Sequence, residues 1–476
     1  MGRECDVVVI GMGPGGEEVA GRLAEAGLDV VGVEAELLGG ECPYWACVPS
    51  KMIVRAGNLL ADARRVPGMA GDARVEPDWS PVAARIRDEA TTDWDDAAAV
   101  ERFTGKGGHF VRARGRLTGP GQVEAGGETY TARRAVVVAT GSASWAPPVD
   151  GLDAVPYWTN REAVSAKERP ESLLVLGGGA VGVELAQGYA RFGTRVTVVE
   201  AADRLLPPEE PESGALVARV LESEGLTVRT RARAASVRHE GDTFTLVLDG
   251  GEQLRADRLL VATGRRPRLS GLGLETAGLD PEARTLRVDG HMRAVPEKHG
   301  GLLGHGHGHG RGGEPGLWAV GDVTGEGAFT HMAMYQADIA VRSILGEDGP
   351  AADYRAVPRV TFTDPEIGAV GLTEEAAREQ GLSIRTGIAE VPSSTRGWIH
   401  KAGNDGFIKL VEDTSRGVLV GATSAGPEGG ETLYGLAVAV RAAVPVVTLR
   451  DMIYAYPTFH RGVLDALADL DRPERA

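Results

Sequence analysis

Residues 5–16 read Cys-Asp-Val-Val-Val-Ile-Gly-Met-Gly-Pro-Gly-Gly, and this stretch decides the fold. The apolar run over residues 5–10 predicts a strand, and the spacing after the glycines predicts a helix over residues 17–26. Gly11, Gly13 and Gly16 allow a tight turn and let the backbone approach a pyrophosphate, which binds where the free amides of a helix N-terminus favour an anion. The stretch therefore predicts a dinucleotide-binding unit.

An acidic residue follows where a nucleotide requires one. A second apolar strand is predicted over residues 29–33, and Glu34 at its end is positioned to take the ribose hydroxyls of an adenosine. The same device recurs with a strand at 172–176, turn glycines Gly177, Gly179 and Gly182, a strand at 196–199 and the acid Glu200. The chain is therefore expected to bind two dinucleotides. The alternative is that both stretches are glycine turns of ordinary α/β units.

Each unit has a further apolar strand later in the chain, over residues 135–141 and 259–264, and both of these segments end in Ala-Thr-Gly. Because parallel strands end at the same edge of a sheet, the final glycines Gly141 and Gly264 are candidates for contact with the two cofactors.

Length, composition and charge narrow the class of protein. A chain of 476 residues is too long for one core and predicts about three domains. The sequence has no apolar run long enough to span a membrane and no basic segment before its first strand, so we expect neither a membrane span nor a signal peptide and predict a cytoplasmic protein. The net charge of −16 disfavours nucleic acid and anionic membranes as partners.

Two of the three cysteines, Cys42 and Cys47, are separated by only four residues. In a reducing compartment such a close pair favours redox chemistry over a structural disulfide. The alternative is two ordinary core cysteines at a helix start. Cys5, alone in the first strand, is expected to be buried packing.

The flanking Gly-Gly, the cysteine spacing and the trailing Pro-Ser-Lys of residues 39–51 resemble the redox motif of the class I FAD-dependent pyridine nucleotide-disulfide oxidoreductases, the family of dihydrolipoamide dehydrogenase, glutathione reductase and mercuric reductase. The resemblance implies FAD in the first unit and a nicotinamide in the second. Residues 317–322 look like the second FAD motif of the family, in which Asp322 meets the ribityl chain. Glu200 favours NADH over NADPH, although Arg204 could pair with a 2′-phosphate.

The resemblance also assigns roles. Cys47 is the thiol nearest the flavin, and Cys42 is the interchange thiol that meets the substrate. Lys51 and Glu184 match the ion pair beside flavin N5; the alternative is that each is an ordinary charged residue of its helix. A small-molecule electron acceptor follows from these roles.

The expected fold is α/β, with two Rossmann-like dinucleotide-binding domains and a C-terminal α+β dimerisation domain, so that a homodimer is implied. The FAD-binding domain is predicted in two parts, residues 1–148 and 270–348. The NAD(P)-binding domain, residues 149–269, is inserted between them, and the dimerisation domain follows at residues 349–476. Residues 67–96 have a helical pattern, residues 105–131 predict a small antiparallel excursion, and residues 406–411 and 417–422 predict strands.

The chain departs from the family near its C-terminus. The family carries His-Pro-Thr-x-x-Glu, donated across the dimer interface, where this chain has Tyr456-Pro457-Thr458-Phe459-His460-Arg461. Losing a positioned imidazole removes a general acid-base contribution of about 10² to 10⁴-fold. A phenol at Tyr456 can donate a proton but is a poor base, while Arg461 near Cys42 would lower the pKa of that thiol. His460 is a second candidate for the missing base.

Three functions stay open on the sequence: a disulfide reductase, a diaphorase-like reductase of quinones or metal ions, and an FAD redox sensor without turnover. One segment fits none of them. Residues 299–310 are rich in glycine and histidine, which alternate over residues 305–310, and this predicts either a passive surface insertion or a site for a transition metal. No other metal site is predicted.

Overall fold

The computed structural model describes residues 2–295 and 315–472, and these residues form two compact units. Unit 1 comprises Met1–Pro49, Ala84–Trp145 and Arg265–Asp353, and unit 2 comprises Ser50–Ala83, Ala146–Gly264 and Tyr354–Ala476. One boundary falls inside helix α3 (Cys47–Arg65), so its first residues belong to unit 1 and the others to unit 2. The histidine- and glycine-rich stretch 299–310 lies outside the described residues. The finer division at residues 148, 269 and 348 stays a prediction.

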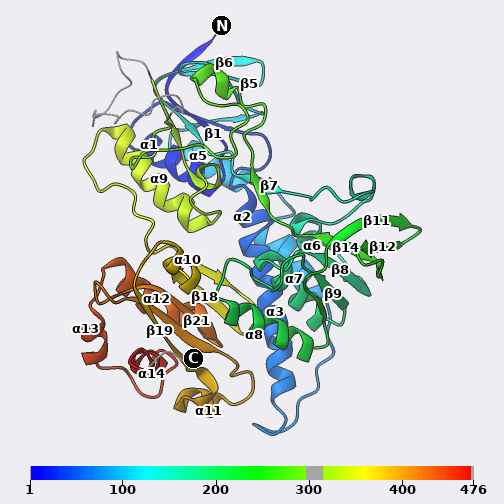
Figure 1. Cartoon of the computed structure of the whole chain (residues 1–476). Coiled ribbons are helices and arrows are strands. Elements are labelled where there is room, and N and C mark those ends of the chain that lie inside the picture. Colours follow the sequence, from blue (N-terminus) through cyan, green and yellow to red (C-terminus); the bar gives the residue numbers. More distant parts are fainter. Residues whose placement is uncertain (1, 296–314, 473–476) are drawn as a thin grey trace. The chain divides into compact units, whose positions relative to one another are not determined.

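A seven-stranded sheet forms the centre of unit 1 (Figure 1). Its order is β3-β2-β1-β6-β5-β4, with β16 paired to β6. The strands β1, β2, β3, β6 and β16 are parallel, whereas β4 and β5 return antiparallel as the glycine-rich stretch predicts. The strands of unit 1 are β1 (Arg3–Ile10), β2 (Val30–Glu34), β3 (His109–Arg112), β4 (Arg116–Gly119), β5 (Gln122–Ala125), β6 (Glu128–Val138), β7 (Ser142–Ser144), β15 (Arg265–Pro267) and β16 (Gly316–Ala319).

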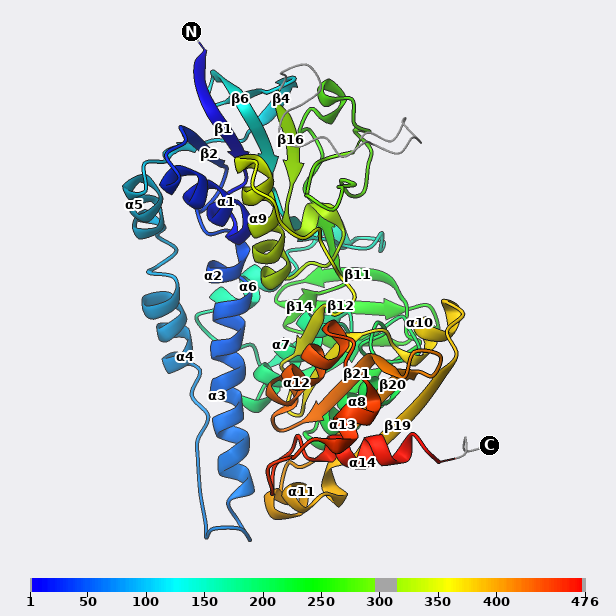
Figure 2. The same cartoon turned by 90° about the vertical axis from the view of Figure 1, so that its left-hand side faces the viewer.

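Helices cover this sheet because its central strands are apolar on both faces. Val7, Val8 and Val9 of β1 are fully buried, and α1 and α9 lie side by side against the sheet (Figure 2). Helix α1 begins at Pro14, earlier than expected, since proline at the first helical position loses no hydrogen bond. The helices of unit 1 are α1 (Pro14–Glu25), α2 (Glu41–Tyr44), η1 (Ile86–Ala90), α5 (Ala97–Gly105), η3 (Leu274–Ala277), η4 (Gly321–Thr324) and α9 (Thr330–Leu345).

The expected helix over residues 67–96 is largely wrong. Only α4 (Ser80–Arg85) and the turn η1 that follows it are helical, and residues 72–78 have no regular structure. Pro67, Pro77 and the glycines at 68 and 71 interrupt the helical hydrogen bonds that the alanines and arginines of this stretch would otherwise favour.

Unit 2 contains a second parallel sheet, of order β10-β9-β8-β14, and a three-stranded antiparallel sheet, β11-β12-β13. The first of these repeats the strand, turn and helix of unit 1, as the second glycine motif predicts. These elements are η2 (Leu152–Ala154), α6 (Asn160–Ser165), β8 (Ser172–Leu176), α7 (Ala180–Arg191), β9 (Arg195–Val199), α8 (Pro211–Ser223), β10 (Thr227–Arg229), β11 (Ala234–Glu240), β12 (Thr243–Leu248), β13 (Gln253–Ala256) and β14 (Arg258–Val261).

The C-terminal part of unit 2 is an antiparallel five-stranded sheet, β17-β18-β21-β20-β19, whose apolar core includes Leu410, Leu433 and Leu467. Its elements are β17 (Pro358–Thr361), β18 (Glu366–Gly371), α10 (Glu374–Glu379), β19 (Ile384–Glu390), η5 (Val391–Ser393), α11 (Thr395–His400), β20 (Phe407–Asp413), β21 (Val418–Gly426), α12 (Gly429–Arg441), α13 (Val446–Asp451) and α14 (Gly462–Asp469). The two strands expected here are therefore present as β20 and β21. Within residues 2–295 and 315–472, no helix combines the length and the apolar character that crossing a membrane requires.

A buried lysine connects the two parts of unit 2. Lys409 of β20 has only 6% of its side chain exposed, and its Nζ lies 2.9 Å from Glu210, 2.8 Å from Glu212 and 3.0 Å from Glu374. Glu210 and Glu212 lie at the start of α8, in the nucleotide-binding part of the unit. The positive charge of the lysine thus compensates the negative charges of carboxylates that come from separate segments of the chain.

Candidate functional site

The two glycine turns have the same geometry, one in each unit. Gly11 and Gly177 both have a positive φ, +94° and +112°, and a Cβ at either would collide with a carbonyl oxygen, that of Ala139 or of Ala262. These two alanines begin the Ala-Thr-Gly segments. The turn and the returning strand are therefore in contact in each unit, at the place where the sequence expects a cofactor.

The glycines of each unit differ in the space around them: some leave room for a ligand, whereas others are enclosed by backbone. A Cβ at Gly16 or Gly182 would collide with the carbonyl oxygen of the first glycine of its own turn. A Cβ at Gly141, Gly179 or Gly264 would meet no atom within 4 Å. This open side of a tightly built turn fits a pyrophosphate, which approaches backbone that carries no side chain.

The acids Glu34 and Glu200 are held by matching pairs of backbone amides. Glu34 accepts hydrogen bonds from Met12 N at 2.8 Å and from Glu36 N at 2.8 Å. Glu200 accepts them from the corresponding positions, Gly178 N at 2.6 Å and Ala202 N at 2.7 Å. A carboxylate has about four acceptor sites, so each acid retains capacity for ribose hydroxyls. The sequence predicts the two acids but not the amides that fix them.

Asp322 in unit 1 accepts a hydrogen bond from the Ser142 hydroxyl. Arg265 in turn donates through Nε to Ser142 Oγ and through Nη2 to the Ser142 carbonyl, both at 2.8 Å. The antiparallel pairing of β7 with β15 brings these segments together. Neither Ser142 nor Arg265 was identified as a site residue from the sequence. The only sequence feature that could have indicated them is that each directly follows an Ala-Thr-Gly motif.

Cys42 lies in α2 and Cys47 begins α3, and both carry free thiols. The two side chains share a hydrogen bond, which together with burial raises the pKa of the Cys42 thiol far above its usual range. The Cys47 sulfur also lies 3.5 Å from the Thr330 hydroxyl at the first turn of α9. A hydrogen bond from Thr330 acts on Cys42 in the opposite direction and lowers its pKa. Thr330 is a second residue that sequence reasoning missed.

Cys5 is fully buried in the core of the first sheet, as expected. Burial raises the pKa of its thiol to about 11, so this cysteine stays a protonated packing residue at neutral pH.

Lys51 and Glu184 form an ion pair within unit 2, with 2.6 Å between Nζ and Oε2. Glu184 is 5% exposed, and its other oxygen accepts a hydrogen bond from Phe362 N at 2.8 Å. The Lys51 ammonium also lies over the Phe362 ring, 4.7 Å from its centroid. The position of this pair beside a flavin stays a prediction.

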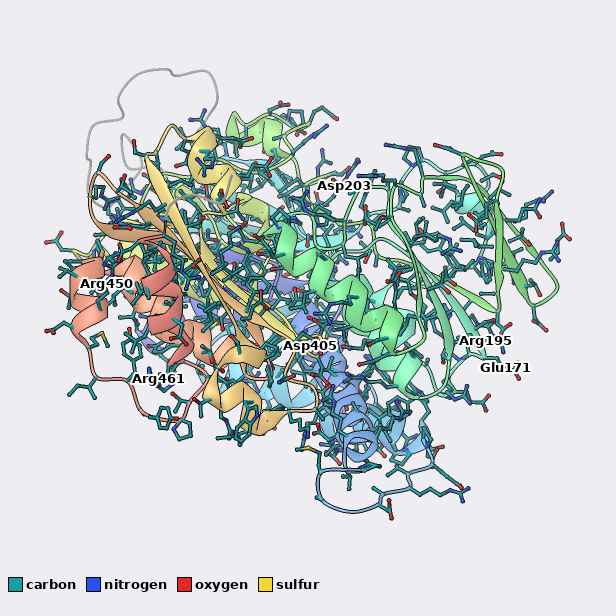
Figure 3. All side chains as sticks on the ribbon, turned by 60° about the horizontal axis from the view of Figure 1, so that its bottom comes forward. Glu171, Arg195, Asp203, Asp405, Arg450 and Arg461 are labelled. Atoms are coloured by element: carbon teal, nitrogen blue, oxygen red, sulfur yellow. The ribbon has the colours of Figure 1, made fainter. Side chains whose placement is uncertain are left out.

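Tyr456 lies on the surface of unit 2 and is 65% exposed. Its hydroxyl is hydrogen-bonded to Thr395 Oγ1 at 3.2 Å, and the Arg461 guanidinium lies over its ring at 5.5 Å. Figure 3 labels Arg461 beside the C-terminal helices. His460 Nε2 lies 3.2 Å from Thr458 Oγ1, so this candidate base is tied to its own loop.

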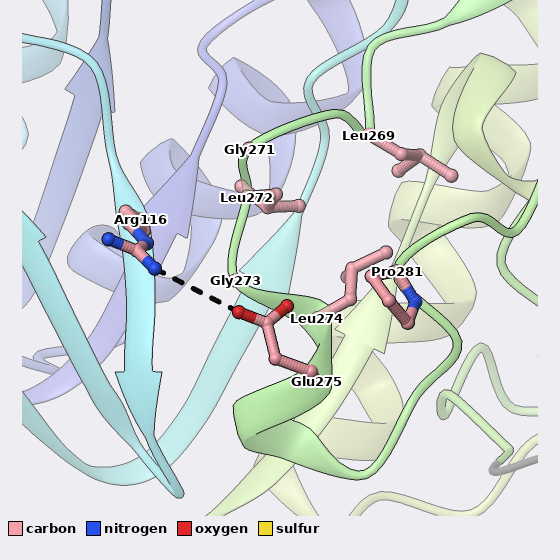
Figure 4. A pocket seen from close by; sticks show the side chains of 8 residues that line it. All are labelled: Arg116, Leu269, Gly271, Leu272, Gly273, Leu274, Glu275 and Pro281. Atoms are coloured by element: carbon pink, nitrogen blue, oxygen red, sulfur yellow. Dashed lines mark ion pairs between the residues drawn. The ribbon is translucent and has the colours of Figure 1, made fainter.

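One hollow in unit 1 contains none of the predicted site residues. It measures about 220 Å³ and lies in unit 1 between β4 and η3, where the Arg116–Glu275 ion pair at 3.8 Å spans it (Figure 4). Another hollow, of about 160 Å³, lies in unit 2 and has Tyr456 and Arg461 in its lining. Among the described residues, no group of three or more histidine, cysteine or acidic side chains is arranged to hold a metal ion.

Comparison with known proteins tests the family resemblance. Residues 5–337 match the family described as pyridine nucleotide-disulphide oxidoreductase, and residues 357–467 match its dimerisation domain. Dihydrolipoyl dehydrogenase of Thermus scotoductus is 34% identical, with 98% of this chain and 97% of that protein covered. Mercuric reductase of Acidithiobacillus ferrooxidans is 31% identical, with 97% and 82% covered.

Solved structures agree with these relatives. LpdA of Mycobacterium tuberculosis has a TM-score of 0.82 at 26% identity and covers 99% of this chain and 100% of its own. The Cu(II) complex of the HOCl-induced flavoprotein disulfide reductase RclA of Escherichia coli has a TM-score of 0.81 at 25% identity, with 97% and 99% covered.

These matches confirm the predicted α/β fold with its dinucleotide-binding arrangement and C-terminal dimerisation domain. The cofactors of the family, FAD and NAD(P)H, are those predicted, and the dimerisation domain supports a homodimer. Since relatives with named enzymatic activities match over nearly its whole length, the chain belongs to the class I pyridine nucleotide-disulphide oxidoreductases and is a flavin-dependent disulfide oxidoreductase.

Proposed function

We propose that this enzyme passes electrons from NAD(P)H through FAD to the Cys42–Cys47 pair and on to a small disulfide. The observation that carries the proposal is the hydrogen bond between the two thiols. This contact supports the proposal, because thiol–disulfide exchange requires the two sulfurs to approach each other. When bound, the nicotinamide and the flavin supply the electron pair that reduces these cysteines.

The residues of unit 1 that fit FAD are the first glycine turn and the groups around it: Gly11, Gly13, Gly16, Glu34, Gly141 and Asp322. Those of unit 2 that fit the nicotinamide cofactor are Gly177, Gly179, Gly182, Glu200 and Gly264. Both sets supply backbone amides for a pyrophosphate and a carboxylate for ribose. Lys51 and Glu184 would form a fixed charge pair near the flavin.

Glu200 supports NADH as the better donor. Its two backbone hydrogen bonds hold a negative charge at the mouth of the second turn, where it would accept from a ribose 2′-hydroxyl and repel a 2′-phosphate. Arg204, four positions further along, could offset part of that repulsion. We therefore expect a higher kcat/KM for NADH than for NADPH. A clear NADPH preference would contradict this role of Glu200.

The exchange with the acceptor needs only the two cysteines. The Cys42 thiolate attacks one sulfur of the acceptor disulfide, forms a mixed disulfide and releases a thiolate that takes up a proton. The Cys47 thiolate then attacks the Cys42 sulfur, which closes the Cys42–Cys47 disulfide and releases the second thiol. The acceptor gains two electrons and two protons, and the cysteine pair loses them.

Tyr456 would serve this exchange as a proton donor rather than as a base. By resemblance it stands where the family presents a histidine to the interchange thiol of the other subunit. A phenol can protonate a departing thiolate but does not readily take a proton from Cys42 at neutral pH. The proposal therefore predicts slow turnover with disulfides that have poor leaving groups.

An acceptor screen with wild type and Cys42→Ser tests the proposal. NADH consumption with small disulfides should be lost in the variant, while the reduction of bound FAD by NADH should be kept, because Cys42 acts after the flavin. Disulfide turnover that survives in Cys42→Ser would contradict the proposal.

A second candidate is the reduction of quinones or soft metal ions. The replacement of the histidine by Tyr456 favours it, since such acceptors release no thiolate that needs a proton. The similar structure of RclA is a Cu(II) complex, and several relatives are mercuric reductases. Turnover of quinones or Cu(II) far above that of every disulfide would favour this candidate.

A further inference from the structure

The hollow of about 160 Å³ in unit 2 is lined by side chains from two segments that are distant in sequence. Its lining includes Ser393, Thr395, Arg396, Tyr456, Arg461 and Asp465. The hydrogen bond from Tyr456 to Thr395 joins the two segments at its wall. The hollow therefore adjoins the residue that stands in for the family's histidine.

Two arginines give this hollow its charge. Arg396 and Arg461 are both half-buried, and neither forms an ion pair with a carboxylate of the described residues. Most arginines around them in unit 2 differ in this respect; Arg385 and Arg450, for example, pair with acids at 2.9 Å and 2.8 Å. In a chain with a net charge of −16, two uncompensated guanidinium groups in one hollow stand out.

Aromatic rings hold both guanidinium groups in place. Arg396 lies over Phe459 at 5.1 Å from the ring centroid, and Arg461 lies over Tyr456 at 5.5 Å. Stacking engages the flat face of a guanidinium, while its five N–H donors lie in its plane at the edge. Since the contacts with the rings use none of these donors, the N–H groups of both arginines can serve the two oxygens of a carboxylate.

Asp465 is the one acidic residue in the lining. It is exposed, and it forms no ion pair with Arg461 although it lies four positions along the chain from it. The side chains of the lining carry two positive charges and one negative, so the hollow keeps a net positive charge. A volume of 160 Å³ corresponds to about five water molecules, which is the scale of a short carboxylate-bearing chain end.

We propose that this hollow binds a carboxylate of the electron acceptor, so that the enzyme selects anionic disulfides. The inference rests on the proposed disulfide reductase function and names its substrate class. Arg396 and Arg461 bind the carboxylate, the hydroxyls of Ser393 and Thr395 offer further hydrogen bonds, and Tyr456 connects this site to the exchange chemistry.

Lipoate and lipoamide test the proposal, because they share one disulfide and differ only in carboxylate against amide. With holoenzyme and saturating NADH, kcat/KM for lipoate should exceed that for lipoamide by roughly tenfold to a hundredfold, the value of a charge-assisted hydrogen bond. Arg396→Gln should bring the ratio close to one by lowering only the lipoate value. Arg396→Lys should restore part of it, since a lysine keeps the charge but loses bidentate geometry.

Arg238→Gln is the matched control, since Arg238 is an exposed arginine of β11 in the same unit and outside the hollow. It should leave both kcat/KM values unchanged. A wild type that favours lipoamide or treats the two alike, or an Arg396→Gln enzyme that keeps the lipoate preference, overturns the proposal.

Binding without turnover separates this inference from the function on which it rests. In the Cys42→Ser holoenzyme, calorimetric titration should detect lipoate but not lipoamide, and adding Arg396→Gln should abolish the lipoate signal. That result supports the anion site even if neither compound is reduced. Absence of lipoate binding in Cys42→Ser overturns it, whereas disulfide turnover that survives in Cys42→Ser overturns only the role of the cysteines.

Discussion

The surroundings of Cys42 favour the protonated form of its thiol. The shared hydrogen bond with Cys47 and the burial of Cys42 both raise the pKa of this thiol, and Thr330 opposes them. Since the thiolate is the nucleophile, these contacts would make Cys42, the proposed interchange thiol, less reactive within one subunit. By resemblance, Arg461 of a second subunit would supply the positive charge that lowers this pKa when the acceptor site is complete.

Removing Cys47 should therefore activate Cys42. Cys47→Ala deletes the largest cause of the raised pKa, so at a fixed pH below that pKa a larger fraction of Cys42 becomes thiolate. Iodoacetamide should alkylate Cys42 faster in this variant than in reduced wild type, with the pH profile displaced to lower pH, as measured by mass spectrometry.

Thr330→Val is the matched control of opposite sign. It deletes a hydrogen bond that lowers the pKa of Cys42, so alkylation of reduced Thr330→Val should be slower than that of wild type. Equal rates in all three proteins would contradict the contacts assigned to these thiols.

Restoring the family residues should change disulfide turnover selectively. Tyr456→His with Arg461→Glu returns an imidazole and its orienting acid, which contribute about 10² to 10⁴-fold where they act on a leaving group. Turnover of neutral lipoamide should rise by at least ~10-fold, whereas quinone turnover should change little. Lipoamide is the appropriate substrate because it does not need Arg461 for binding. If wild type reduces lipoamide as fast as it reduces quinones, another group, His460 first, serves as the acid-base.

At the scale of elements, the sequence predicts most of the features that depend on residues close together in the chain. The strand, glycine turn and acid of each unit follow from residues close together in the chain, because a turn with positive φ and a pyrophosphate site require glycine. Thr330, Ser142 and Arg265 could not be found this way, since each meets its partner only through the tertiary fold. The helix expected over residues 67–96 failed because its prolines and glycines outweigh the periodicity.

The repeated turns allow a matched pair of substitutions. Gly16→Ala and Gly182→Ala each place a methyl group against the carbonyl oxygen of the first glycine of the turn, so both should force strand and helix apart. Gly16→Ala should lower the FAD content of the purified protein, read from its flavin absorbance. Gly182→Ala should keep its FAD and slow flavin reduction by NADH.

Gly105→Ala, at the end of α5, serves as the control because its Cβ would meet no atom within 4 Å. It should match wild type in both assays. Loss of FAD in Gly182→Ala, or its retention at wild-type affinity in Gly16→Ala, would contradict the assignment of the two turns.

At the scale of the whole molecule, the dimerisation domain carries unusually exposed apolar side chains. Tyr434 of α12 is 75% exposed, Val447 of α13 is 72% exposed, and Ile453 in the following loop is 98% exposed. Large apolar side chains exposed to this extent are typical of a surface that another protein covers. In a family with a dimerisation domain, a second copy of the chain accounts for them.

Ile453→Glu should weaken the homodimer, because a charge would be buried where an apolar side chain now fits. Analytical ultracentrifugation should show more monomer at low protein concentration. Disulfide turnover should fall with the dimer, since Tyr456 is predicted to act on the other subunit, while flavin reduction by NADH should persist. Val75→Glu, at a residue 50% exposed and outside this domain, should change neither property. A variant that stays dimeric would contradict the assigned surface.

The buried Lys409 limits how freely this protein can be recombined with its relatives. A coenzyme-binding module exchanged by protein engineering would carry α8 with its own residues in place of Glu210 and Glu212, and would leave the lysine of the recipient with Glu374 as its remaining carboxylate partner. Breaking a buried ion pair costs about 3 to 5 kcal/mol when a charge is left without compensation, so losing two of three carboxylates would cost a large part of the stability of a typical domain. A chimera that alters coenzyme choice must therefore transplant the lysine and its carboxylates together, or replace all of them with apolar side chains.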